Sequence, residues 1–222
     1  TLVAYRHSGY GLVATYIFFI LTFLFILLST FLTRSGILGE TSVHAFTDLG
    51  MSGQLLIFML FYIALSAFLF ALRGKEIPSP QKEEAGSSRE FWMFVGSLLL
   101  LISAVYIIVL TSLPFFNKLF GTSWAIGENV EYVYNRIMIL VAIILGVLTA
   151  MTQYFKYKET TRKYIWSKLL IPTVIAVVLS AALSIWGEVK YDKHGLGFLV
   201  GIHVALWAAI YTVIANAHYL AV

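Results

Sequence analysis

The sequence contains no cysteine, and this absence excludes several kinds of site. Without cysteine there is no disulfide framework, no thiolate zinc site, no Cys-x-x-Cys redox pair and no Cys-x-x-Cys-His site for covalent heme attachment. Any heme bound by these 222 residues is therefore held without thioether bonds.

Charge is also scarce, since charged residues make up only 12% of the chain. Apolar residues reach 60%, against roughly 45–50% in an average soluble domain, and the mean hydropathy is +0.88. This composition indicates an integral membrane protein.

Apolar runs of about 20 residues, the length that spans a bilayer as a helix, recur along the whole chain. They do not alternate in polarity as the strands of a membrane barrel do. The sequence therefore predicts an all-α fold, a single polytopic domain over residues 1–222 built as a bundle of six transmembrane helices. The predicted spans are 12–33, 51–72, 91–113, 137–155, 169–187 and 196–217.

The connections between the spans differ in their content of Lys and Arg, and the richer side of a membrane protein is usually cytoplasmic. We expect both ends of this chain and a flexible loop at 73–90 to be cytoplasmic, and the loops at 34–50 and 114–136 to be external. The formal net charge of +4 then reflects topology, and no connection has the basic and aromatic pattern of a nucleic-acid groove. The basic residues assigned inside are Arg6, Arg73, Lys75, Lys82, Arg89, Lys156, Lys158, Arg162, Lys163 and Lys168; those outside are Arg34, Lys118, Arg136, Lys190 and Lys193.

Small residues and one proline predict how the helices pack. Ala142, Gly146 and Ala150 recur every four residues, a spacing that lets helices approach closely in lipid, and Ala176, Ser180 and Ser184 repeat the pattern. We expect these stripes to serve packing. Pro172 is expected in the first turn of its helix, where the missing N–H costs little.

The five histidines are the candidate metal ligands, and a site with two axial imidazoles needs two of them at similar depth. His44 lies in an external loop, and the other two outer candidates are His194, in a turn, and His203, inside the last span. The admissible pairs are His44 with His194 or His203, and the two inner-face residues His7 and His218. His203 and His218 are about 22 Å apart along one helix and cannot share an iron. A neutral His203 bonded to a neighbouring helix is the alternative to a functional role.

His44 has the neighbourhood best suited to a ligand. Arg34, at the outer end of a span, offers a planar fork of donors suited to a carboxylate such as a heme propionate. The side chain of Phe46 could cover a porphyrin face. Alternatively, Arg34 reaches lipid headgroups or pairs with Glu40 or Asp48.

Two phrases in this region, Thr33-Arg34-Ser35-Gly36 and Ser42-Val43-His44-Ala45-Phe46, resemble the CcmF and CcsA-type cytochrome c maturation proteins. The resemblance is close up to about Gln54 and looser afterwards. By it, His44 matches an external axial ligand of heme iron, and the chain is part of a heme lyase in a bacterial inner (plasma) membrane. The resemblance implies transient non-covalent heme and, as partners, apocytochrome c, a heme carrier protein and other maturation subunits. No residue of this chain is an evident acid, base or nucleophile for the attachment of heme.

The chain also departs from the family pattern. The tryptophan-rich segment ending in Trp-Asp, which forms the heme platform of the family, is absent, and Trp92, Trp124, Trp166, Trp186 and Trp207 are scattered. Since the chain opens at Thr1 without Met, we expect an internal piece of a longer protein, inactive alone. The ligands of a separate b-type heme would lie outside it. The phrase around His203 is a poor match for that role.

Three other functions stay open. A non-catalytic assembly subunit of a membrane complex would bind no cofactor. A transporter or channel is disfavoured because no Asp, Glu, Lys or Arg lies well inside a span. A quinol-linked cytochrome b would need histidines paired on adjacent helices, and this chain offers only weak pairs.

Overall fold

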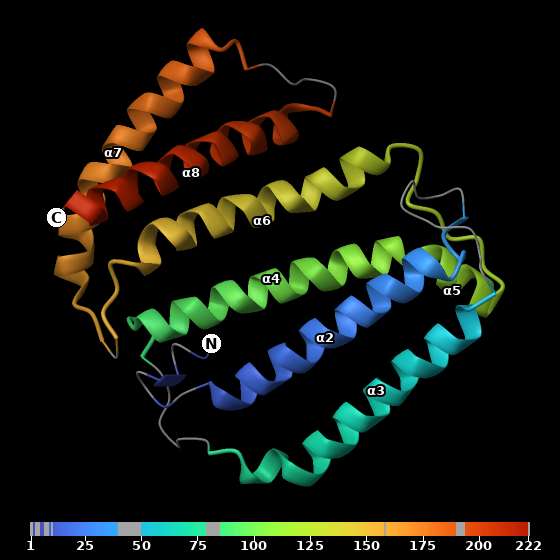
Figure 1. The fold of residues 1–222 in the computed structure, drawn as a ribbon. Coiled ribbons are helices and arrows are strands. Elements are labelled where there is room, and N and C mark those ends of the chain that lie inside the picture. The colour runs from blue at the N-terminus through green and yellow to red at the C-terminus, as the bar shows by residue number, and fades with distance from the viewer. Residues whose placement is uncertain are drawn as a thin grey trace. The chain divides into compact units, whose positions relative to one another are not determined.

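The computed structural model describes residues 2, 5–6, 9, 11–39, 50–78, 85–157, 159–189 and 194–221, and these residues form helices and turns with no strand among them (Figure 1). Within these ranges, six helices are long and apolar enough to cross a membrane. The expected all-α fold with six spans is confirmed. The helices are α2 (Leu12–Arg34), α3 (Ser52–Arg73), α4 (Arg89–Thr111), α5 (Leu113–Phe120), α6 (Val130–Thr152), α7 (Arg162–Trp186) and α8 (Leu196–Ala221).

Two of the spans begin seven residues earlier than their apolar runs. Helix α6 starts at Val130 because the Asn129 side chain caps it, accepting a hydrogen bond of 2.9 Å from the backbone N–H of Tyr132. Helix α7 starts at Arg162, so the expectation that Pro172 lies in a first turn is wrong. Pro172 is inside the helix and buried. It leaves a carbonyl one turn earlier without its usual helical donor.

The connection expected to be an external loop at 114–136 contains an additional helix, α5. Pro114 lies in its first turn, where a proline needs no N–H partner, and Gly121 ends it with a φ of 64°. Proline here separates α4 from a second helix rather than from an irregular loop.

The described residues divide into two compact units, each treated by itself below. The first unit comprises 1–81 and 106–125, and the second 82–105 and 126–222. The expectation of one domain over the whole chain stays a prediction.

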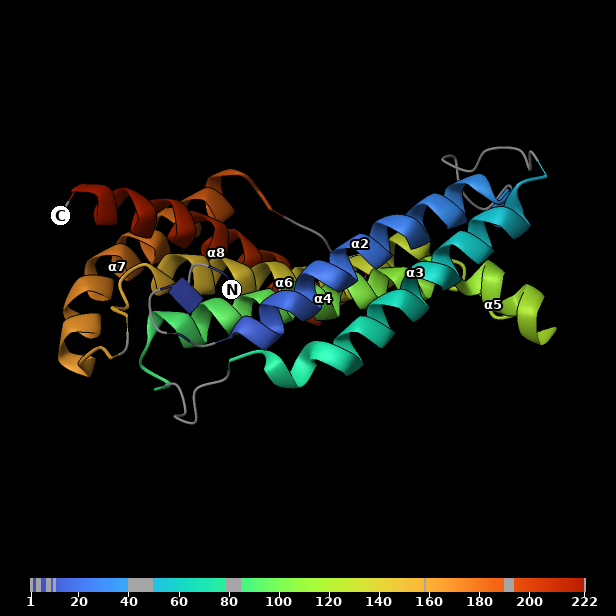
Figure 2. The same ribbon diagram turned by 60° about the horizontal axis from the view of Figure 1, so that its bottom comes forward.

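In the first unit α2 and α3 pack against each other in opposite directions, as Figures 1 and 2 show. Phe23 of α2 meets Tyr62 near the middle of α3 with ring centroids 5.2 Å apart. At the far end of the pair, Phe31 and Met59 are buried together. Large apolar side chains therefore hold this pair of helices along its length.

In the second unit α8 packs against both α6 and α7 (Figure 1). Tyr132 of α6 contacts Phe198 at the start of α8, and Gly146 contacts Ala208 further along both helices, so the two run parallel. The core between the three helices contains Ala150, Leu169, Ala176 and Ala215, together with the rings of Tyr154 and Tyr211.

The small-residue stripes pack as expected only in part, because Ala142 is exposed and Ser184 is half-buried. Ala150 and Ala176 are completely buried, and Ser180 is nearly so. A Cβ built on Gly146 would lie 3.1 Å from the Cβ and 3.1 Å from the carbonyl oxygen of Ala208. Thr212 donates a hydrogen bond of 2.8 Å to the Gly146 carbonyl across this interface. A glycine therefore sets the distance between α6 and α8.

The sequence 73–90, expected to be a flexible loop, is structured at both ends. Arg73 is the last residue of α3 and is followed by the 3-10 turn η2 (Gly74–Glu76). At the other end, the Ser88 hydroxyl accepts a hydrogen bond of 3.1 Å from the N–H of Phe91, and Arg89 begins α4. The Arg89 side chain donates to the carbonyls of Thr152 and Gln153 at 3.2 and 2.6 Å, satisfying the end of α6.

Candidate functional site

The motif that singled out this region forms the end of α2. Arg34 is the last helical residue, and the backbone N–H of Ser35 closes the helix on the Phe31 carbonyl at 2.9 Å. Gly36 follows with a φ of 69°, a left-handed conformation in which a Cβ is costly. The Ser-Gly pair thus stops the helix so that Arg34 is exposed at its end while Ser35 is buried.

A cluster of buried apolar side chains lies beside this helix end. Phe31, Leu32 and Leu38 are buried together with Met59 of α3. Phe115 of α5 packs edge-on against Phe31 with ring centroids 5.6 Å apart. The additional helix therefore covers the end of the pair formed by α2 and α3.

A cavity of about 250 Å³ lies beside this cluster. Its walls come from α2, α3 and α5, with Phe31, Leu56 and Phe115 as apolar walls and Lys118 as a cationic one. Pockets that enclose a small molecule usually measure about 300–1,000 Å³. The cavity is thus large enough for the edge of a flat ring and too small for a whole porphyrin.

The donor set of this region fits one end of a heme. Heme has an apolar face and two carboxylates at one edge. In this region the aromatic walls of the cavity lie close to Lys118, and the exposed Arg34 lies at the end of α2. Such a combination suits an amphiphilic anion bound edge-on. Of the two predicted binding residues, only Arg34 lies within the described residues. His44 lies outside them, as do its neighbours Glu40, Phe46 and Asp48.

His203 is half-buried in α8, and its Nδ1 lies 2.9 Å from the Leu199 carbonyl oxygen of the same helix. The expected partner on a neighbouring helix is therefore wrong, because the bond is made within α8. It leaves Nε2 as the nitrogen that carries a lone pair in the neutral ring. A cavity of about 310 Å³ adjoins His203 and Trp207.

The ring of His194 packs against two aromatic rings in the second unit. Its ring centroid lies 4.1 Å from that of Tyr132 and 5.4 Å from that of Phe198. The pairs of His44 with His194 or His203 stay untested. Within the described ranges, no three side chains from His, Asp or Glu gather as a metal site.

His218 has a structural partner that the sequence did not reveal. The hydroxyl of buried Tyr154 donates to the Ala215 carbonyl at 2.7 Å and lies 2.9 Å from Nδ1 of His218. Because the tyrosine has one proton, His218 donates through Nδ1. Burial raises the pKa of Tyr154, which follows the end of α6, and so keeps its hydroxyl protonated. His7, the expected partner of His218 in a metal site, lies outside the described residues.

Two residues beside the cavity were missed by sequence reasoning. Phe115 and Lys118 lie in the segment expected to be an external loop, yet both line the cavity. A signal was present: Ser112 and Pro114 mark a helix start, and Gly121 marks its stop. The short length of α5 concealed it.

The chain is similar to proteins named as cytochrome c-type biogenesis proteins. It is 32% identical over 187 residues to the cytochrome c-type biogenesis protein CcmF of Escherichia coli K12, which covers 83% of this chain and 27% of that protein. The CcmF of Pseudomonas aeruginosa PAO1 is also 32% identical, over 189 residues, with the same shares. The cytochrome c-type biogenesis protein NrfE of Haemophilus influenzae is 28% identical over 97% of this chain and 34% of that protein.

The chain thus spans about a quarter to a third of the length of the curated relatives it matches. No protein-family model matches the chain, and no solved structure matches it significantly.

Proposed function

We propose that this multi-pass membrane chain, which is of the CcmF type, acts in cytochrome c biogenesis. In this proposal it holds heme at the outer face of the membrane for attachment to apocytochrome c. Heme is the substrate in this proposal. The membrane is a bacterial inner membrane, with the loop of His44 outside.

The observation that carries the proposal is the segment from Arg34 to Phe46. It joins an exposed cation at a fixed helix end to a histidine ten residues later, in a chain whose relatives are named for cytochrome c biogenesis. The apolar walls and Lys118 beside that helix end support it further, because they suit the propionate edge of a heme.

Each residue has a distinct task in this account. His44 binds the heme iron as one axial ligand, and the second ligand comes from outside this chain. Arg34 donates hydrogen bonds to a propionate and so fixes the rotation of the ring in its plane. Lys118 adds a second positive charge close to the apolar wall formed by Phe31 and Phe115.

The chemistry belongs to the substrate, since the heme vinyl groups react with the thiols of the apocytochrome. The contribution of this chain is to orient the ring edge toward the incoming thiols, which accelerates a reaction by positioning alone. No side chain of the described site serves as acid, base or nucleophile. A heme carrier protein and other maturation subunits complete the proposed assembly.

The test uses the purified intact protein supplied with a heme carrier. His44→Ala should lose the delivered heme, whereas His194→Ala should keep it, because the second ligand is supplied from elsewhere. Arg34→Gln should weaken heme retention about tenfold through the loss of charge-assisted hydrogen bonds. Arg136→Gln is the matched control, an exposed arginine that belongs to the second unit.

Retention of delivered heme and of cytochrome c maturation by His44→Ala would overturn the proposal. A non-catalytic assembly subunit would then be the better description. Loss of heme in His194→Ala as well would instead place both axial ligands within this chain and refute the assignment of the second one.

A further inference from the structure

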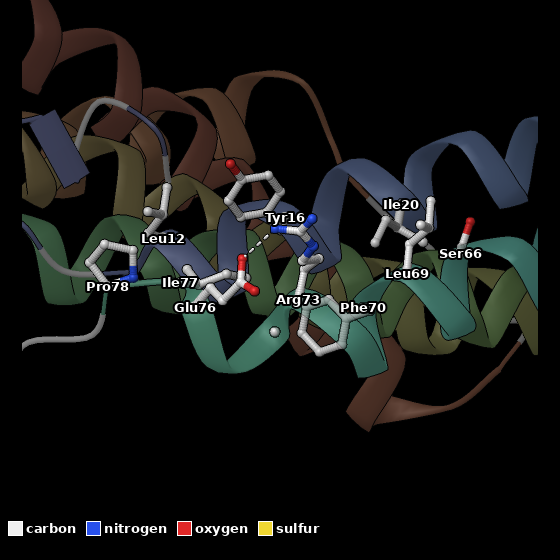
Figure 3. Close-up of a pocket in the computed structure, with 11 residues that line it drawn as sticks. Leu12, Tyr16, Ile20, Ser66, Leu69, Phe70, Arg73, Glu76, Ile77 and Pro78 are labelled. Carbon is white, nitrogen blue, oxygen red and sulfur yellow. Dashed lines mark hydrogen bonds and ion pairs between the residues drawn. The ribbon is translucent and has the colours of Figure 1, made fainter.

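A cavity of the first unit lies between α2 and α3 at the end opposite to the candidate heme site. It measures about 550 Å³, within the range of small-molecule pockets. Its walls are formed by the start of α2, the last two turns of α3 and η2 (Figure 3). Leu12, Ile20, Leu69 and Phe70 make these walls largely apolar.

The polar groups are arranged unequally along this cavity. At one end, Arg73 and Glu76 form an ion pair of 2.8 Å, drawn as a dashed line in Figure 3. Ser66 lies seven residues before Arg73, about 10 Å further along α3. Tyr16 and Ser66 also line the cavity, among mainly apolar side chains.

The ion pair is held weakly and is open to a ligand. The side chains of Arg73 and Glu76 are 74% and 62% exposed, so their mutual attraction is screened and contributes little to stability. A ligand that carries both signs of charge can therefore replace the pair with two contacts of its own. Both charges lie at the end of a membrane-spanning helix, at the depth of lipid headgroups.

We propose that this cavity binds phosphatidylethanolamine from the surrounding leaflet. The phosphate would lie on Arg73, the primary ammonium on Glu76, and an acyl chain along Leu69 and Ile20. A cation and an anion three residues apart match the opposite charges of a zwitterionic headgroup.

The same geometry discriminates between headgroups. Phosphatidylglycerol has a phosphate for Arg73 but presents no cation to Glu76. Phosphatidylcholine has a cation without N–H donors, so it cannot make the charge-assisted hydrogen bonds that an ammonium makes to a carboxylate. The site should therefore prefer phosphatidylethanolamine over both.

The experiment is native mass spectrometry of the purified protein in detergent, exchanged against an equal mixture of the three phospholipids with identical acyl chains. The wild-type protein should retain phosphatidylethanolamine about tenfold more than phosphatidylcholine. Glu76→Gln should abolish this preference by lowering the retention of phosphatidylethanolamine to that of the other two lipids, whose retention should stay unchanged. Arg73→Gln should reduce the retention of all three lipids about tenfold.

Two further variants separate the cavity from the general surface. Lys75→Gln removes a neighbouring charge on the same turn that does not line the cavity, and it should behave like the wild type. Leu69→Trp fills the cavity and should reduce the retention of all three lipids, with helix content checked by circular dichroism.

Equal retention of the three lipids by the wild type, or the same loss in Lys75→Gln as in Arg73→Gln, would overturn the proposal. The inference does not rest on the proposed heme function. Heme retention by the Arg73 and Glu76 variants therefore provides a separate readout and should stay at the wild-type level.

Discussion

Replacing Gly146 by alanine tests whether the contact of α6 with α8 depends on a missing side chain. The added Cβ would lie 3.1 Å from two atoms of Ala208 and 3.2 Å from Oγ1 of Thr212. Carbon atoms in favourable contact lie about 3.5–4.0 Å apart. Helix α8 must therefore move away by several tenths of an ångström, because two of the three contacts are with its backbone and its Cβ carbon.

The expected cost follows from these contacts. Overpacking of this kind destabilises by about 1–3 kcal/mol. Separation of the helices also weakens the hydrogen bond of 2.8 Å from Thr212 to Gly146, and such bonds between membrane helices contribute about 0.6 kcal/mol. Alanine returns roughly 0.5–1 kcal/mol through its better helix propensity. The net loss is about 1–3 kcal/mol, which at about 2–4 °C per kcal/mol lowers Tm by roughly 2–12 °C.

The assay is thermal unfolding of the purified protein in a mild detergent, followed by circular dichroism. Gly96→Ala is the matched control, because Gly96 lies inside α4 and its Cβ would meet only the flexible end of Leu148 at 3.9 Å. The Tm of that control should stay at the wild-type value or rise slightly. A Tm of Gly146→Ala equal to that of Gly96→Ala would refute the reasoning about this contact.

Three further predictions concern side chains outside that contact. Tyr154→Phe should lower the free energy of unfolding by about 1–3 kcal/mol, since it leaves a half-buried His218 donor unpaired. Tyr219→Phe, an exposed control, should not lower it, and equal losses in the two variants would contradict the assigned role. Burial raises the pKa of Tyr154 above its ordinary value of 10.0. The contribution of this tyrosine to the free energy of unfolding is therefore complete below pH 10.0 and is lost as the pH rises through the folded-state pKa. Alkaline melting curves should show this loss in the wild type and not in Tyr154→Phe. Arg89→Gln should speed hydrogen exchange at the end of α6, where two carbonyls lose their donor; unchanged exchange there would show that the cap is dispensable.

Much of the fold follows from the sequence because the signals are long. Six apolar runs predict six spans, and the stripes at Gly146 and Ala176 predict the faces on which they pack. The ends of the helices were harder to predict. An asparagine cap extends α6 to Val130, and a seven-residue extension of α7 moves Pro172 into its interior, since hydropathy does not register polar helical turns beyond the apolar core.

The candidate site was predicted less completely for a different reason. The motif around Arg34 is local in sequence, so its residues could be recognised by their spacing. The contribution of Phe115 depends on a contact with Phe31 across 84 positions of the chain, and the contribution of Tyr154 depends on one with Ala215. No periodicity encodes such distant pairs, and they become visible only when the helices are packed.

The central claim is that His44 binds heme that arrives from outside. The most direct measurement is the absorbance spectrum of reduced heme in the purified protein after exposure to a loaded heme carrier, compared between the wild type and His44→Ala. The account predicts that the delivered heme is lost in the variant while any heme bound elsewhere in the protein is kept. An unchanged spectrum in the variant would contradict it.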